Sequence, residues 1–237
     1  MKRIAIIPAR MGSTRFPGKP LASINGKPMI QRVYEAAQGA GCFGGVYVAT
    51  PDQEIRKTVE GFGGDCIATR GDFPTGSDRV ASAARTRNID RNCLIVNVQG
   101  DYPYIPSRAV AMLCYAMELT KAKICTLVRP LDAEDMGNLN VVKANVNALE
   151  YAVDFARQAF KHPCDGMLPA YEHIGVYAFR NEYLQHFAEM PQSPREKEES
   201  LEQLRIIENG ERIMAVAINE KVQSVNTPGD LEVLSAC

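Results

Sequence analysis

Residues 3–20 read RIAIIPARMGSTRFPGKP, and the fold prediction starts from this stretch. The apolar run at 4–7 has the composition of a buried β-strand, and a glycine-containing loop with three cations follows it directly. The segment at 28–38 then spaces its apolar side chains like one face of a helix. A buried strand, a loop and an amphipathic helix in this order predict the first unit of an α/β fold.

The same alternation continues along the chain. Further strands are expected at 45–50, 65–69, 93–98, 123–129 and 213–218, and further helices at 52–62, 77–87, 106–119, 195–205 and 230–235. This pattern predicts an α/β fold with a mostly parallel sheet. We interpret residues 1–237 as a single domain, in which the less regular stretch at about 130–190 contributes a smaller subdomain.

Composition narrows the class of protein. The formal net charge is −1 and no basic stripe is present, so nothing indicates a nucleic acid partner. No apolar stretch approaches the ~18 residues of a membrane span. The seven cysteines include no CxxC pair, which favours reduced thiols in a cytoplasmic protein over disulfides or a zinc cluster.

Three loops, at 8–20, 70–79 and 99–105, each follow an expected strand. Ligands of open α/β sheets bind beyond the carboxyl ends of the strands, so we expect these loops to share one site. The first loop resembles a P-loop, but five residues separate its glycines and Pro20 replaces the magnesium-binding hydroxyl. Its cations Arg10, Arg15 and Lys19 could neutralise a polyphosphate, and the alternative is a solvated basic turn.

The other two loops each allow two interpretations. Asp101 ends the most apolar strand and could hold a magnesium ion beside phosphate oxygens, although Gly-Asp pairs also close strands as simple turns. Arg70 and the amides near Gly76 could contact a base, whereas Ser77 and Asp78 are equally consistent with a helix cap.

Taken together, these loops resemble those of the 3-deoxy-manno-octulosonate (Kdo) cytidylyltransferases, or CMP-Kdo synthetases, which are relatives of the CMP-sialate synthetases. The matching motifs are IPARMGSTRFPGKPLASINGKPMIQRVYE, TRGDFPTGSDR, VNVQGD, HIGVYAFR, SLEQLR and VNTPGDLE, in the expected order over nearly the whole chain. The resemblance implies a Rossmann-like αβα sandwich whose small subdomain binds the acceptor and makes a homodimer. It also implies transfer of CMP from CTP to an acidic acceptor, with Mg²⁺ as cofactor and pyrophosphate as leaving group.

The resemblance further implies a role for each matching residue. Arg10, Ser13, Arg15 and Lys19 would hold the triphosphate, and Arg70, Gly76, Ser77 and Gln99 would lie at the cytosine and ribose. Arg10, Lys19 and Asp101 would be catalytic, with Asp101 and Asn226 at the metal. The acceptor-side residues would be Gln99, Arg157, His173, Tyr177, Glu199 and Gln203. Without the family, His173 would be a structural histidine, and Glu199 and Gln203 a solvated helix face.

Three positions depart from the family pattern. Tyr102 replaces a usual glutamate, Ala156 a usual serine, and Asn226 an aspartate that is a second magnesium ligand in the family. Asn226 can offer a metal a carbonyl oxygen but no negative charge. Because these changes lie on the acceptor and second-metal side, the acceptor could be Kdo, an 8-amino Kdo or a small phosphonate. A CTP-binding protein with weakened catalysis is the remaining alternative.

Overall fold

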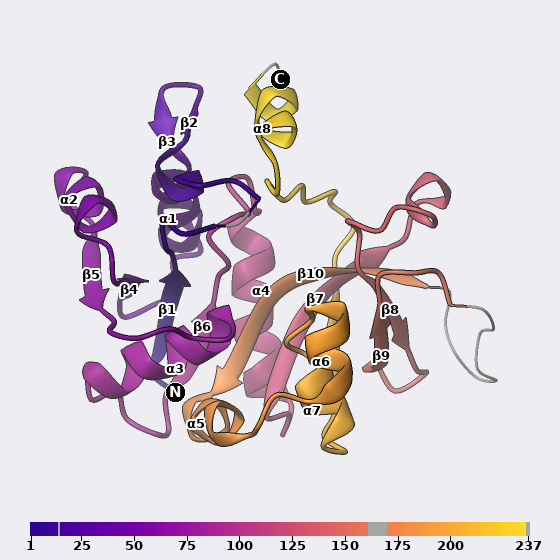
Figure 1. Cartoon of the computed structure of the whole chain (residues 1–237). Coiled ribbons are helices and arrows are strands. Elements are labelled where there is room, and N and C mark those ends of the chain that lie inside the picture. The colour runs from indigo at the N-terminus through magenta and orange to yellow at the C-terminus, as the bar shows by residue number, and fades with distance from the viewer. Residues whose placement is uncertain (14, 161–169, 236–237) are drawn as a thin grey trace.

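The computed structural model describes residues 1–13, 15–160 and 170–235, which form a central sheet with helices on both faces (Figure 1). The strands are β1 (Arg3–Pro8), β2 (Ser23–Ile24), β3 (Lys27–Pro28), β4 (Val46–Thr50), β5 (Asp65–Ala68), β6 (Leu94–Asn97), β7 (Ile124–Pro130), β8 (Lys143–Val146), β9 (Tyr151–Ala156), β10 (Tyr171–Arg180) and β11 (Ile213–Ala217). The α-helices are α1 (Met29–Gly39), α2 (Gln53–Gly61), α3 (Gly76–Thr86), α4 (Ser107–Leu119), α5 (Asn181–Glu189), α6 (Pro194–Glu199), α7 (Leu204–Glu208) and α8 (Pro228–Ser235). Short 3₁₀ turns cover Lys19–Leu21 and Ala133–Asp135.

The main sheet confirms the predicted α/β class. Over the described residues its strand order is β5-β4-β1-β6-β10-β7-β11-β9-β8. The strands β5, β4, β1 and β6 are parallel neighbours, while β10 runs antiparallel between β6 and β7. The sheet is therefore mixed, and the carboxyl ends of its four parallel strands share one edge (Figure 1).

The alternation of side chains along β1 explains why helices cover both faces of the sheet. Ala5 and Ile7 pack into a core with α1, α2 and α4, whereas Ile4 and Ile6 face the opposite core with α3 and α5. Successive side chains of a strand point to opposite faces, so an unbroken apolar run needs a helix layer on each side. The run at 4–7 is thus buried from both sides, as its composition predicts.

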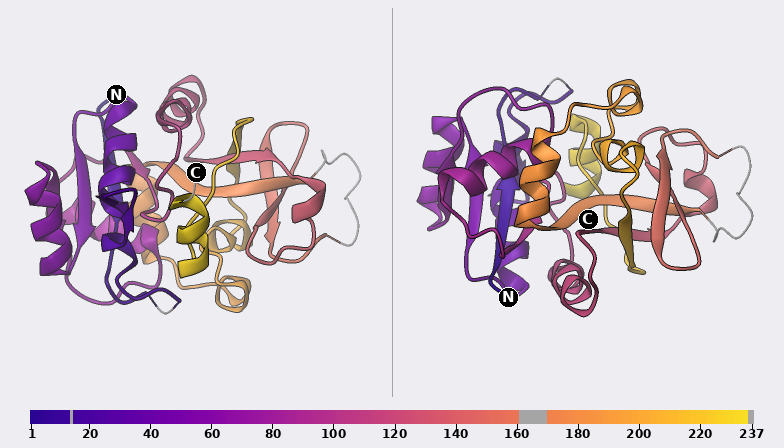
Figure 2. Two further views of the ribbon diagram at one scale, coloured as in Figure 1. Left: turned by 90° about the horizontal axis from the view of Figure 1, so that it is seen from above. Right: turned by 90° about the horizontal axis from the view of Figure 1, so that it is seen from below.

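The second half of the sheet curls back on itself. The pairing of β8 with both β9 and β10 closes a circuit through β7 and β11. In both views of Figure 2 the β8–β9 hairpin lies on the opposite side of the molecule from β4 and β5, with α8 between them. The stretch at about 130–190, which we expect to contribute a smaller subdomain, supplies β8, β9 and β10 to this circuit, and its residues 161–169 lie outside the described residues. Its acceptor-binding and dimerisation roles stay predictions.

The helix predicted at 195–205 is wrong in one respect, because the chain forms two short helices there. Ser200 ends α6 in the left-handed conformation with φ of 53°, and the amide of Leu201 returns to the carbonyl of Glu196. The charge pattern suits a continuous helix, but the left-handed residue redirects the chain. As a result Glu202 and Gln203 sit in the break between α6 and α7.

Among the described residues, no helix combines the length and the apolar character needed to cross a bilayer.

Candidate functional site

The three predicted loops meet at the carboxyl edge of the parallel strands. They line a cavity of about 480 Å³, with residues from the first loop, the α3 N-terminus and the turn after β6. A second cavity of about 640 Å³ shares Arg10, Arg15, Gly76, Gln99 and Asp101 with the first and extends toward β10 and the α6–α7 break. The shared site expected from the strand-end rule is therefore present, and it continues into a second compartment.

The first loop brings its cations to these cavities. Arg10 and Arg15 are exposed and line both, and Ser13 and Lys19 line the smaller one. Gly18 adopts a left-handed conformation with φ of 74°, which glycine tolerates best, and this turn starts the short helix at Lys19. The loop therefore places three positive side chains around one space that suits a polyphosphate.

Lys19 and Asp101 form an ion pair at the centre of the site. The Lys19 Nζ lies 3.0 Å from Asp101 Oδ2 and also donates to the Val225 carbonyl at 3.0 Å. The Val225 amide in turn donates to the Asp101 carbonyl at 2.9 Å. These contacts tie the first loop, the turn after β6 and the segment before α8 together, although the three are far apart in sequence.

Asn226 enters the site beside Arg15. Its Oδ1 accepts a 2.9 Å hydrogen bond from Arg15 Nη2, and its Nδ2 donates to the Ser224 hydroxyl. Asp230 caps the start of α8 by accepting from the Asn226 and Thr227 amides, which fixes this segment. The half-buried Asp101 carboxylate and the Asn226 side-chain carbonyl offer oxygen ligands of the kind that Mg²⁺ prefers, so these two residues fit such an ion.

The N-terminus of α3 forms the wall between the two cavities. Thr75 and Asp78 form a capping box, so α3 begins at Gly76. A Cβ at Gly76 would lie 2.7 Å from the Gln99 amide nitrogen, so any larger residue at this position would displace the Gln99 side chain. The Ser77 hydroxyl accepts from Asn97 inside the protein, so its side chain faces the core and its amide faces the site.

Glu202, which the sequence reasoning missed, joins this wall to the second cavity. Its carboxylate accepts from the Ser77 amide at 3.0 Å and from Gln99 Nε2 at 3.1 Å. Burial raises the pKa of Glu202 above its ordinary value. Glu202 lies within the SLEQLR motif, but a continuous helix would have pointed Glu199 and Gln203 to one face instead.

A second residue missed from the sequence is Arg79, the last residue of TRGDFPTGSDR. It is buried, lines the smaller cavity, stacks over the Phe73 ring and donates to the Thr69 hydroxyl. Arg70, which the resemblance assigns to the nucleotide, is exposed in the loop after β5 and does not line either cavity.

Three of the expected acceptor-side residues line the second cavity and form one hydrogen-bonded chain. The Tyr177 hydroxyl donates to Gln203 Oε1 at 3.1 Å, which turns the Gln203 amide nitrogen toward His173 Nδ1 at 3.4 Å. His173 Nε2 then donates to Thr126 Oγ1 at 2.9 Å. Burial lowers the pKa of His173 to about 3, so the ring is neutral at physiological pH.

Arg157 and Glu199 contact each other at the rim of that cavity. The Arg157 Nε donates to the Glu199 carbonyl at 2.9 Å, and its amide donates to the Glu199 carboxylate. Arg157 lines the second cavity and Glu199 does not. The buried Lys143 donates to the Arg157 carbonyl at 2.7 Å and so holds this strand end in place.

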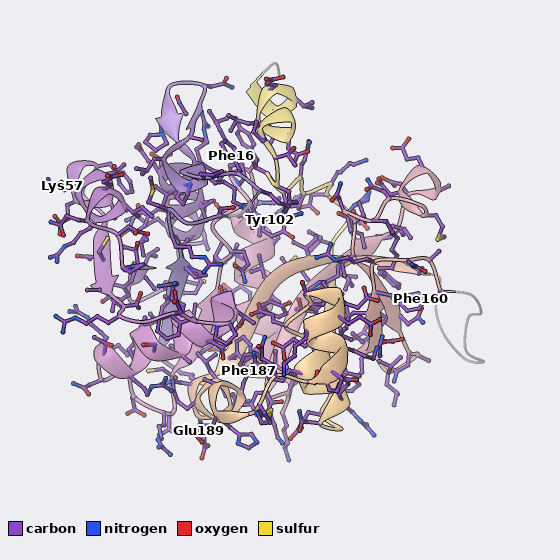
Figure 3. All side chains as sticks on the ribbon, viewed as in Figure 1. Phe16, Lys57, Tyr102, Phe160, Phe187 and Glu189 are labelled. Atoms are coloured by element: carbon purple, nitrogen blue, oxygen red, sulfur yellow. The ribbon has the colours of Figure 1, made fainter. Side chains whose placement is uncertain are left out.

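Behind the site, Arg205 links two helix N-termini. Its guanidinium contacts Asp78 at 2.9 Å and Glu196 at 2.6 Å, and it stacks on Phe187, whose position on α5 is labelled in Figure 3. Asp78 and Glu196 are the carboxylates of the capping boxes that begin α3 and α6. Arg205 therefore holds together two helix starts that carry cavity-lining residues.

Comparison with known proteins gives four similarities. The family described as "Cytidylyltransferase" matches residues 4–213. The chain is 40% identical to the 3-deoxy-manno-octulosonate cytidylyltransferase of Syntrophobacter fumaroxidans, over 98% of this chain and 95% of the relative. It is 39% identical to the 8-amino-3,8-dideoxy-manno-octulosonate cytidylyltransferase of Shewanella sp. (strain W3-18-1), over 98% and 96% respectively. A solved CMP:2-keto-3-deoxy-manno-octonic acid synthetase in complex with CTP superposes with a TM-score of 0.91 at 36% identity, covering 100% of this chain and 98% of that chain.

Proposed function

We propose that this chain, which belongs to the cytidylyltransferase family, transfers CMP from CTP to Kdo or a closely related sugar acid. It is a nucleotidyltransferase of the same type as its Kdo cytidylyltransferase relatives. One observation carries the proposal: the cationic first loop faces Asp101 in a cavity that continues into a second, differently lined compartment. The first compartment suits CTP and the second suits an acid of sugar size.

The reaction requires little covalent chemistry from the protein. A hydroxyl oxygen of the acceptor attacks the α-phosphorus of CTP and its proton passes to water, while the bond from the α-phosphorus to the bridging oxygen breaks as pyrophosphate leaves. Arg10, Arg15 and Lys19 neutralise charge that develops on the phosphoryl oxygens and on the leaving group. Positioning and electrostatics therefore supply the catalysis.

We propose Mg²⁺ as the cofactor, with Asp101 as its charged ligand and the Asn226 carbonyl as a neutral one. When bound, the ion would withdraw charge from phosphate oxygens. Lys19 now occupies one Asp101 oxygen, so we expect Lys19 to exchange this contact for a CTP phosphate when nucleotide and metal enter.

On the acceptor side, Arg157 is the cation best placed for the sugar carboxylate, because it lines the second cavity with its guanidinium held by the Glu199 and Leu139 carbonyls. Gln99 and Glu202 offer polar atoms at the boundary between the compartments, where sugar hydroxyls would lie. The neutral His173 and the buried Tyr177 are hydrogen-bonded to Gln203 and hold its side chain in place.

An 8-amino Kdo is the second candidate acceptor, since a relative at 39% identity carries that activity in its name. A pyrophosphate-release assay with CTP and Mg²⁺ tests both acids and a small phosphonate in parallel. We expect turnover with one of the octulosonates. Calorimetric CTP binding without pyrophosphate release from any of the three acids would instead support the CTP-binding protein with weakened catalysis.

We also propose that the protein works as a cytoplasmic homodimer through the subdomain at about 130–190. Free cysteines among the described residues suit a reducing compartment, and exposed Leu139 and Leu149 on this subdomain suit an interface. Light scattering after size exclusion tests the mass, and a monomer at micromolar concentration would contradict the dimer.

A further inference from the structure

The ladder between β6 and β10 stops at the point where the two compartments meet. Its last pair is Asn97 with Tyr177, and beyond it β10 continues toward the small subdomain along β7. The β7–β10 register shifts between Ile174 and Tyr177, so Gly175 sits in a bulge. The Gly175 amide therefore donates its hydrogen bond to a side chain from the nucleotide half of the molecule rather than to a strand neighbour.

That side chain is Tyr102. Its phenolic oxygen accepts from the Gly175 amide at 3.0 Å, across a sequence separation of 73 residues. Tyr102 lies near the middle of the molecule, between the β1 half and the β10 strand (Figure 3). It also lines the second cavity and packs against the core that contains α1 and α4.

Tyr102 directly follows Asp101 in the chain, so its contact acts on the loop that carries the proposed metal ligand. On the nucleotide side this loop is tied to Lys19 and to Val225. On the acceptor side this loop is held by the hydrogen bond that the Gly175 amide donates to Tyr102. Gly175 lies two residues from both His173 and Tyr177 in the sequence. The loop is therefore anchored from both compartments.

We propose that Tyr102 is a positioning residue that sets the spacing between Asp101 and the acceptor strand β10. This inference rests on the proposed function, because the spacing matters only if a group is transferred between the two compartments. A phenol suits this task because two side-chain torsions fix its oxygen about one ring length from the backbone. A misplacement of about 1 Å between reacting groups can cost on the order of 10²-fold in rate.

The test replaces Tyr102 by phenylalanine, which removes one oxygen and keeps the packing. We expect kcat for pyrophosphate release to fall about tenfold or more, while the dissociation constant of CTP measured without metal stays within about twofold. Tyr34→Phe is the matched control. The Tyr34 hydroxyl also accepts from a backbone amide, that of Asp65 at 3.2 Å, but lies on α1 outside both cavities.

Thermal melts of both variants show whether each is folded at the assay temperature. A kcat for Tyr102→Phe within about twofold of the wild type overturns the proposal. The proposal is equally overturned if Tyr34→Phe lowers kcat as much, because activity then follows stability rather than position.

If the wild-type protein turns over none of the acids, the proposed function fails but the role of Tyr102 is not yet tested. A second measurement then tests that role. Calorimetric titration with Mn²⁺ in the presence of CTP reports on the Asp101 loop without any acceptor. We expect Tyr102→Phe to weaken Mn²⁺ binding about tenfold, as loss of a group supporting a metal ligand does, and Tyr34→Phe to leave it unchanged. Equal Mn²⁺ affinity in the wild type and Tyr102→Phe overturns the proposal.

Discussion

Arg205→Met tests whether the two helix starts behind the site depend on one guanidinium. The Arg205 side chain is 1% exposed, and its two carboxylate partners, Asp78 and Glu196, are 7% and 1% exposed. Methionine keeps much of the side-chain length and its contact with Phe187 but removes every donor. Both carboxylates then remain buried without their cation.

The expected cost follows from that burial. Breaking a buried ion pair by removing one partner costs about 3–5 kcal/mol, since the remaining charge stays desolvated. In a domain of this size each kcal/mol lowers the melting temperature by roughly 2–4 °C, so we expect a decrease of roughly 6–20 °C. Each carboxylate also keeps its capping-box bonds to Thr75 or Ser193, which limits the loss.

The assay is urea unfolding followed by far-ultraviolet circular dichroism, because the chain contains no tryptophan for fluorescence. Arg195→Met is the matched control. Arg195 lies in the same segment and pairs with Asp154, but its side chain is 39% exposed, so its loss costs less than about 1 kcal/mol. If Arg205→Met unfolds within 1 kcal/mol of the wild type, the reasoning from buried charge is refuted.

Three further predictions concern the site. We expect Asp101→Ala to lower pyrophosphate release by about 10²-fold or more while CTP binding without metal persists, and full activity would contradict the metal assignment. Asn226→Asp should keep or raise activity and tighten Mn²⁺ binding, since it adds a negative charge beside Arg15 at the proposed metal site. Because burial lowers the pKa of His173 to about 3, the native state binds fewer protons than the unfolded state, and stability falls as pH drops from about 6.5 toward 3. The free energy of unfolding should fall by about 2 kcal/mol by pH 5 through this effect. Urea unfolding of His173→Gln should not show this decrease.

Much of the site could be predicted because strand ends are local signals. The apolar runs before Arg10 and Asp101 mark the carboxyl ends of β1 and β6, and parallel neighbours bring those ends together. The cations of the first loop and Asp101 therefore meet in the cavity without any knowledge of side-chain geometry. The second compartment was harder to predict, since it is built from antiparallel strands and a broken helix.

The helix break shows why the rest could not be predicted. Charge periodicity in residues 195–205 favours one helix with Glu199 and Gln203 on one face. The left-handed Ser200 changes the direction of the chain, so Glu202 reaches Ser77 and Gln99 while Glu199 contacts Arg157. A single residue with positive φ decides this, and serine is not a residue that signals it.

By itself the sequence determined the α/β class, the family and the cationic loop at the end of the first strand, because each depends on patterns within a few consecutive residues. Only the tertiary structure decided that Glu202 faces the second compartment, that Arg79 lines the first, and that Tyr102 reaches β10. The physical reason is the range of the contacts: the bond from Ser77 to Glu202 spans 125 residues and that from Gly175 to Tyr102 spans 73. Such pairs are set by how the sheet curls and where a bulge frees an amide, and no local pattern encodes them.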